Sequence, residues 1–127
     1  ITTAQASAVW SGASTQRPTI ITSAGDFNGD GFTDVVLGAP SAATVGETGG
    51  AAYLFYGPVS GSFEVSAADV TFNGVQSEAL VGHRVGSPGD LNGDGWDDLV
   101  ITAPGFDHVG GAGIDTGAAY VWLGQGE

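Results

Sequence analysis

The stretch Gly89-Asp-Leu-Asn-Gly-Asp-Gly-Trp-Asp-Asp-Leu-Val-Ile-Thr-Ala-Pro104 decides the fold, because the chain contains it twice. The first copy is Gly25-Asp-Phe-Asn-Gly-Asp-Gly-Phe-Thr-Asp-Val-Val-Leu-Gly-Ala-Pro40, and ten of the sixteen aligned positions are identical. Asp26 and Asp90 open the two acidic loops and lie 64 positions apart in a chain of 127 residues. Self-similarity at a fixed period is the sequence signature of a repeat architecture. The chain is therefore predicted to consist of two copies of one supersecondary unit.

The charge balance narrows the classes of partner. The chain carries 14 acidic residues against two basic ones, Arg17 and Arg84, for a formal net charge of -12. Nucleic acids and anionic membrane surfaces both bind through Lys and Arg, so neither is an expected partner. Hydrophobic residues make up 42% of the chain and charged residues 13%, which is typical of a packed domain rather than a disordered segment. No apolar run is long enough for membrane insertion, and there is no cysteine for disulfide or thiol chemistry.

Short β-rich segments surround each acidic loop. β-Branched and aromatic residues bounded by glycine and proline are typical of strands. The first copy has four such segments and the second has three: residues 19–23, 34–37, 50–57 and 70–72, then 83–87, 98–101 and 117–124. Pairing consecutive segments gives a four-stranded antiparallel meander, which fits a propeller blade or half of a β-sandwich. We therefore predict an all-β fold with two four-stranded β-propeller blades per chain.

The second copy ends before its fourth segment, whereas the chain begins with one. Residues 6–12 match residues 68–74, with Trp10 in the place of Phe72. We expect residues 16–76 to form the first blade, residues 77–127 the three inner strands of the second, and residues 1–15 to complete the last blade of a neighbouring chain. Because each blade packs between two neighbours, that exchange would close a homo-oligomeric ring of two to four chains. The alternative is that the chain is a fragment of a longer propeller.

Each acidic loop has the spacing of a Ca²⁺ cage. Counting from the first Asp, side-chain oxygens stand at positions 1, 3, 5 and 9, glycine stands at position 6, and position 7 offers its backbone carbonyl. The predicted ligands are Asp26, Asn28, Asp30, Phe32 and Asp34 in the first loop, and Asp90, Asn92, Asp94, Trp96 and Asp98 in the second. Carboxylates about 5 Å apart repel by roughly 3 kcal/mol per pair at an effective dielectric constant of about 20, and a divalent cation removes that cost. We predict one Ca²⁺ per loop, two per chain.

Other interpretations of the loops are weaker. Asp, Asn and Gly also form turns that need no ion, but the second copy keeps every oxygen position of the first. An EF-hand requires Glu at position 12 followed by a helix, whereas Leu37 and Ile101 occupy that position in strand-like segments. Soft metals are disfavoured, because no Cys, His or Met lies in either loop.

The pattern Asp-x-Asn-x-Asp-Gly-x-x-Asp, followed by a hydrophobic strand and Gly38-Ala-Pro40, resembles the FG-GAP repeat of the β-propellers of integrin α-subunits. The second copy has Thr102-Ala-Pro104 in that place. The resemblance covers essentially the whole chain as two repeats. It implies four-stranded blades, Ca²⁺ held in the loop between the first two strands of each, an extracellular or cell-surface location, and a role in adhesion or ligand recognition.

These observations favour a module whose Ca²⁺ is structural and which serves as a scaffold or interaction surface for a protein or glycan ligand, not as an enzyme. The alternative is a lectin of the same fold with sugar pockets between blades, and a metal-dependent hydrolase is less favoured. Trp10, Trp96 and Trp122 could stack on sugars, but large aromatic residues in strands more often fill the space between sheets. His83 and His108 form no Ser–His–Asp set by spacing, and Asp97 is expected to be solvated.

Overall fold

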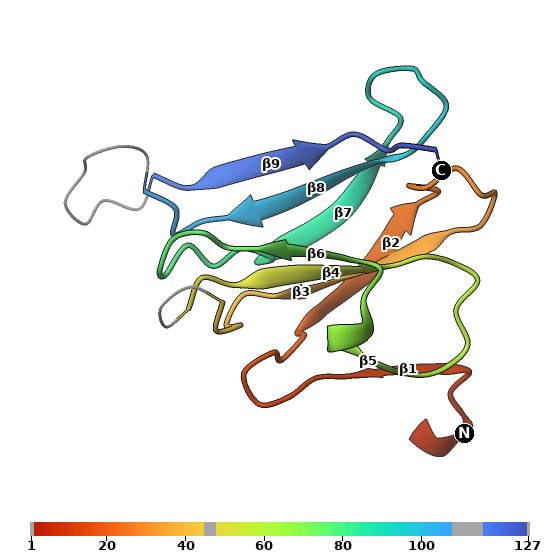
Figure 1. Cartoon of the computed structure of the whole chain (residues 1–127), viewed down its shortest axis with the longest axis horizontal. Coiled ribbons are helices and arrows are strands. Elements are labelled where there is room, and N and C mark those ends of the chain that lie inside the picture. The colour runs from red at the N-terminus through yellow and green to blue at the C-terminus, as the bar shows by residue number, and fades with distance from the viewer. Residues whose placement is uncertain (1, 45–47, 108–115, 127) are drawn as a thin grey trace.

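The computed structural model describes residues 2–44, 48–107 and 116–126, which form three stacked β-sheets (Figure 1). The middle sheet, in the order β2-β3-β4-β6, holds the first copy: β2 (Ile20–Gly25), β3 (Asp34–Ala39), β4 (Ala51–Phe55) and β6 (Val70–Asn73). The second copy forms a sheet on one side of it, in the order β7-β8-β9: β7 (Arg84–Gly89), β8 (Asp98–Ala103) and β9 (Ala118–Trp122). On the other side lie β1 (Ala8–Ser11) and β5 (Gly61–Glu64).

Both copies fold as antiparallel sheets, so the prediction of an all-β fold is confirmed. β3 pairs with β2 and β4, and β4 pairs with β6 in a register that sets Phe72 opposite Ala52. β8 pairs with β7 and β9, with Tyr120 opposite Ile101. Within the described ranges the second copy's sheet contains three strands and ends at β9. Ring closure and the exchange of residues 1–15 between chains stay predictions.

The pairing of β1 with β5 was not predicted. The two strands run parallel, and Trp10 lies opposite Phe63. β5 lies between the third and fourth predicted strands of the first copy, and the 3₁₀ helix Val65–Ala67 leads from it to β6. Another 3₁₀ helix, Thr3–Gln5, precedes β1. The N-terminal strand is thus held on the middle sheet of its own chain.

The main core lies between the middle sheet and the sheet of the second copy. Val36 and Leu54 from the middle sheet and Leu99 and Ile101 from β8 are each 0% exposed. Burying a Leu or Ile side chain completely stabilises a fold by roughly 1.5–3 kcal/mol. This face-to-face packing holds the two copies together.

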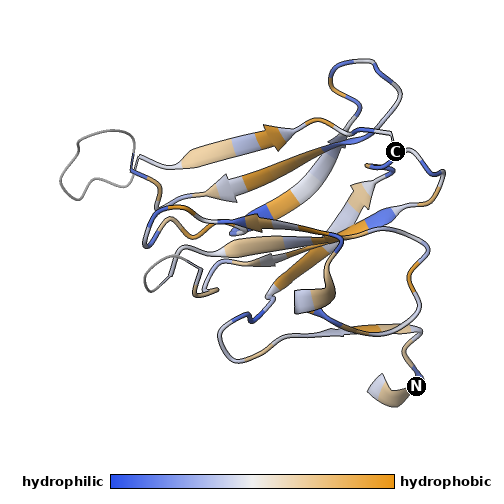
Figure 2. Cartoon of the chain, in the orientation of Figure 1, coloured by the Kyte–Doolittle hydropathy of each residue, from blue (hydrophilic) through white to orange (hydrophobic). Residues whose placement is uncertain are grey.

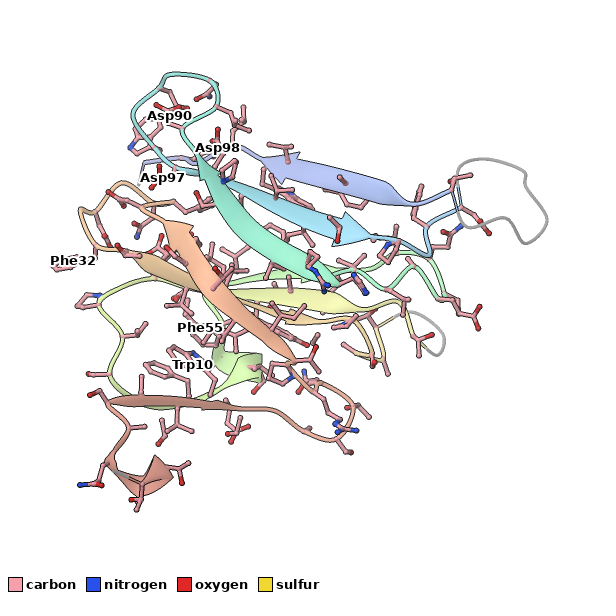
Figure 3. All side chains as sticks on the ribbon, turned by 180° about the vertical axis from the view of Figure 1, so that it is seen from behind. Trp10, Phe32, Phe55, Asp90, Asp97 and Asp98 are labelled. Atoms are coloured by element: carbon pink, nitrogen blue, oxygen red, sulfur yellow. The ribbon has the colours of Figure 1, made fainter. Side chains whose placement is uncertain are left out.

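A second core covers the opposite face of the middle sheet. Tyr53, Phe55 and Val65 are buried there, and Trp10 and Phe63 pack against them. The rings of Trp10 and Phe63 stack with centroids 5.5 Å apart, and Trp10 contacts Phe55 edge-on at 6.1 Å (Figure 3). The middle sheet is therefore covered on both faces.

The same aromatic contact occurs at both interfaces. Phe72 on β6 packs against Trp122 on β9, with ring centroids 4.6 Å apart. In the repeat, Trp10 matches Phe72 and Phe55 matches Trp122. β1 therefore packs on the middle sheet in the same way as β6 packs on the sheet of the second copy.

The two acidic loops lie near each other at one end of the sheets, between β2 and β3 and between β7 and β8 (Figure 1). Hydrophilic residues dominate both loops, whereas the strands carry most of the hydrophobic residues (Figure 2). His108 lies outside the described residues. In the part of the chain that the structure describes, there is no helix of the length and apolarity that crossing a membrane requires.

Candidate metal centre

The first acidic loop is a tight turn closed by its own polar side chains. Asp26 Oδ2 accepts a hydrogen bond from the N–H of Gly31 at 3.0 Å, and Asp30 Oδ1 accepts one from the N–H of Phe32 at 2.8 Å. Asn28 Oδ1 accepts from the N–H of Asp30 at 3.2 Å, and Asn28 Nδ2 donates to Asp30 Oδ2 at 2.9 Å. Gly31 has φ 87°, a left-handed conformation that residues with a side chain disfavour. Positions 1, 3 and 5 of the predicted ligand set thus surround one turn.

The second loop repeats this arrangement. Asp90 Oδ2 accepts from the N–H of Gly95 at 2.8 Å, and Asp94 Oδ1 accepts from the N–H of Trp96 at 3.0 Å. Asn92 Nδ2 donates to Asp94 Oδ2 at 2.7 Å, and Gly95 has φ 97°. These equivalent residues make equivalent contacts, but the loops differ at the other oxygen of the first Asp. Asp90 Oδ1 accepts hydrogen bonds from the N–H groups of Gly93 at 2.7 Å and Asp94 at 3.2 Å, whereas Asp26 Oδ1 has no partner among the described residues.

Asp34 and Asp98, at position 9, anchor each loop to the sheet below it. Both are 0% exposed. Asp34 accepts hydrogen bonds from the N–H of Phe27 at 2.9 Å and of Gly57 at 2.8 Å. Asp98 likewise accepts from the N–H groups at the start of its loop and after β9: Leu91 at 2.6 Å and Gly124 at 2.9 Å. Each carboxylate joins three segments of its copy, a structural role that the sequence did not predict.

Two carboxylates of the loops, Asp34 and Asp90, have perturbed pKa values. Burial raises the pKa of Asp34 above its ordinary value, the N–H groups of Gly57 and Phe27 oppose that rise, and the charge of Asp30 adds to it. The N–H of Gly95 lowers the pKa of Asp90. Because a nearby cation favours the ionised form of a carboxyl group, an ion in the first loop would relieve the cost of keeping Asp34 charged.

The chemical type of the predicted metal ligands suits a hard cation. All the predicted side-chain ligands are carboxylate or amide oxygens, which Ca²⁺ prefers. Asp26 Oδ1 is buried and accepts no hydrogen bond from the described residues, and a buried polar atom without a partner calls for an ion or a water. The carboxylate oxygens that accept one N–H retain a second lone pair. Even so, no three His, Cys, Asp or Glu side chains in residues 2–44, 48–107 and 116–126 converge as a preformed metal cluster.

The second copy contacts the first loop, and two of the residues responsible, Asp97 and Gln125, were not predicted to do so. Asp97 Oδ2 accepts a hydrogen bond from the N–H of Asp26 at 2.9 Å, so the expectation that Asp97 is merely solvated is wrong. The Trp96 indole lies directly against the backbone of Gly29. The N–H of Gln125 donates to the carbonyl of Phe27 at 3.0 Å. The signal in the sequence was the difference between the copies, since Asp97 matches Thr33.

All three tryptophans pack against other parts of the chain. Trp10 and Trp122 lie in the two aromatic contacts between sheets, and Trp96 covers Gly29. His83 directly precedes β7, and its N–H donates to the carbonyl of Leu80 at 3.1 Å. The tryptophans thus fill space between elements of the chain, as predicted.

Comparison with known proteins agrees with this geometry. A profile of the FG-GAP repeat matches residues 20–55 and 84–122, which run from β2 through β4 and from β7 through β9. The chain is 31% identical to integrin alpha-4 of Xenopus laevis over 107 residues, which are 80% of this chain and 9% of that protein. It is 35% identical to human integrin alpha-6 over 95 residues, 74% of this chain and 8% of that protein. It is 33% identical to mouse integrin alpha-IIb over 111 residues, 80% of this chain and 10% of that protein.

The chain therefore belongs to the FG-GAP repeat family. It is an all-β, integrin-like chain with two such repeats. It spans about a tenth of the length of the curated relatives that it matches.

Proposed function

We propose that the chain is a Ca²⁺-binding, integrin-like interaction module in which each acidic loop holds one structural ion. The observation that carries the proposal is the buried Asp26 Oδ1, which has no partner among the described residues and lies in a loop with the ligand spacing of a Ca²⁺ site. The residues that would hold the ions are Asp26, Asn28, Asp30, Phe32 and Asp34 in the first loop, and Asp90, Asn92, Asp94, Trp96 and Asp98 in the second. Phe32 and Trp96 would contribute their backbone carbonyls.

The proposed ion adds to a turn that the chain already closes. The N–H groups of Gly31 and Gly95 hold the first carboxylate of each loop without any metal. Bound Ca²⁺ would neutralise the repulsion between the remaining carboxylates. It would therefore stabilise the ends of β2, β3, β7 and β8 rather than create the fold.

Melting and titration test the proposal. Calcium is expected to raise the melting temperature, EGTA to reverse that rise, and calorimetric titration to give two equivalents per chain. Asp30→Ala and Asp94→Ala should each remove one equivalent, because each deletes a ligand of one loop. Glu64→Gln is the matched control, since Glu64 is exposed outside the loops and accepts a bond from Ser11 Oγ at 2.9 Å. A melting temperature indifferent to calcium, with no heat of binding, would overturn the proposal.

The proposed role is that of a scaffold or adhesion surface outside the cell or on its surface, with a protein or glycan as ligand. It is supported by the likeness to integrin α-chains over most of the chain. No catalytic role is proposed for the loops. Hydrolysis of a phosphodiester or ester panel that disappears in Asp90→Ala would contradict this assignment.

The proposed assembly is a homo-oligomeric ring of two to four chains, in which residues 1–15 complete the second copy's sheet in a neighbour. Its support is the place of β1, which relates to the middle sheet as β6 relates to the next sheet. The β4–β6 register sets Phe72 opposite Ala52, so the exchanged strand would set Trp10 opposite Ala119 of the neighbour. A native mass of two, three or four times the chain mass is expected, and a mass of one chain at all concentrations would contradict the ring.

One observation favours a lectin as a second candidate. A cavity of about 310 Å³ lies beside β6 and β9, and aromatic side chains line it: Phe72, Phe106, Tyr120 and Trp122. Aromatic faces with a few polar groups are common in small-molecule sites. A glycan array should give a signal that Tyr120→Ala abolishes if this candidate is right, and no signal on any glycan would remove it.

A further inference from the structure

The outer face of the second copy exposes the repeat partners of residues that the first copy buries. Leu91 is 57% exposed, whereas its counterpart Phe27 is 9% exposed in the main core. Val121 is 52% exposed, whereas its counterpart Leu54 is 0% exposed in the main core. Because paired residues have similar side chains, the difference comes from what covers them: the second copy covers the first, and nothing in the described residues covers the second.

The glycines of the two loops show the same asymmetry. A Cβ on Gly29 would collide with the Trp96 indole, and a Cβ on Gly25 would collide with the Asp97 carboxylate. Their counterparts are Gly93 and Gly89, where a Cβ would meet no described atom within 4 Å. The backbone of the second loop is therefore bare at the two points where the first loop is covered.

The opposite side of the chain exposes the groups that could cover it. Phe32, the counterpart of Trp96, is 52% exposed and points away from the chain at the tip of the first loop (Figure 3). Ile21 is 54% exposed, although its counterpart Val85 packs against the main core. One molecule thus carries both halves of an interface, on opposite sides and each without a partner among the described residues.

We propose that two copies of this chain associate through these surfaces, with Phe32 of one copy lying on Gly93 of the next as Trp96 lies on Gly29. The inference rests on the proposed homo-oligomer and names its contact: the side bearing Ile21 and Phe32 packs on the face bearing Val121 and Leu91. Such a contact is heterologous, so it propagates from copy to copy until the ring closes.

The differences between the copies suit a contact between separate chains. Thr33 stands in the first copy where Asp97 stands in the second. Its backbone N–H would donate to the carbonyl of Asp90 in the next chain, as the N–H of Asp97 donates to the carbonyl of Asp26 at 3.1 Å. The replacement also removes one carboxylate from an interface between molecules of net charge -12. Pro58 replaces Gln125 and has no N–H, so the contact between chains has one hydrogen bond fewer than the contact within a chain.

Native mass measurement of charged variants tests the proposal. Phe32→Asp and Leu91→Asp are each expected to reduce the particle to one chain at concentrations where the wild type is assembled. Val75→Asp, at an equally apolar position that is 78% exposed and outside both surfaces, should stay assembled. Circular dichroism should be unchanged in all three, because each side chain is exposed.

Each result distinguishes this contact from the wider proposal. If the wild type, Phe32→Asp and Leu91→Asp are all assembled, the contact is overturned and the ring is not. A wild type of one-chain mass overturns both, assigns the surface to a further repeat on a longer polypeptide, and leaves calcium binding to its own titration. The native chain has no cysteine, so oxidised Phe32→Cys/Gly93→Cys should form covalent multimers, while Phe32→Cys/Val75→Cys should not. Equal cross-linking in the two variants would also overturn the contact.

Discussion

Asp97 on the second acidic loop accepts a hydrogen bond from the N–H of Asp26 on the first at 2.9 Å, and its own N–H donates to the carbonyl of Asp26 at 3.1 Å. Asp26 is the first predicted ligand of its loop. The second copy therefore fixes the backbone of the first candidate metal loop.

The first prediction concerns this pair. Asp97→Ala should lower the free energy of unfolding by about 1.5–3 kcal/mol, the usual worth of a hydrogen bond to a charged group. It should also speed amide exchange at Asp26. Thr33→Ala, at the matching exposed position, should change the free energy of unfolding by less than about 0.5 kcal/mol. Urea unfolding and hydrogen exchange measure both effects, and equal losses in the two variants would argue against the contact.

The second prediction separates anchoring from metal binding. Asp98→Ala leaves the N–H groups of Leu91 and Gly124 without their acceptor, and each buried unsatisfied donor costs about 1–3 kcal/mol. The loss should appear in EGTA and in calcium alike. Asp94→Ala, at the exposed tip of the loop, should lose stability mainly in calcium. Denaturant titrations under both conditions decide the matter, and a loss confined to calcium for Asp98→Ala would contradict the anchoring role.

The third prediction uses two glycines with similar backbone conformations. Gly25 and Gly89 have φ of 69° and 90°, so alanine pays a similar cost of about 1–2 kcal/mol for a left-handed conformation at either position. Only at Gly25 does the new methyl group collide with Asp97. Gly25→Ala should therefore be the more destabilising by thermal unfolding of the unassociated chain. The reverse order would show that the loops do not touch there.

The fourth prediction compares the two faces of the stack. Leu54→Ala should cost about 2–5 kcal/mol, as truncations of buried leucines do, because Leu54 is 0% exposed. Val121→Ala, at the matching exposed position, should cost less than about 0.5 kcal/mol in the isolated chain. Chemical unfolding at low protein concentration measures both values. A large loss for Val121→Ala under those conditions would mean that the outer face is already buried within one chain.

Every strand except β5 could be predicted, because each of the others carries a local signal. Residues 50–57 and 117–124 are nearly the same sequence, and β4 and β9 lie inside them. β5 could not be predicted in this way, because it is four residues long, mostly exposed, and paired in parallel with a strand far back in the chain. The Trp10–Phe63 stack links it to β1, and no local pattern encodes that contact.

The candidate site divides along the same line. Spacing alone predicted the candidate ligands of each loop, because a cage of oxygens is local in sequence. The same spacing could not show that Asp34 and Asp98 each accept two backbone hydrogen bonds, because one donor of each pair lies beyond the next strand. Nor could it show the role of Asp97, whose partner lies in the other copy.

β6 belongs to one sheet through its backbone and to the next through Phe72, which packs on Trp122. Each repeating unit of the sequence therefore begins with the outer strand of one sheet and continues into the inner strands of the following sheet. Duplication of such a unit in the gene would insert a segment that contacts both of its new neighbouring sheets. Adding whole units should therefore disturb the existing sheets little. A break in the chain between β4 and β6 would instead remove contacts from two sheets at once.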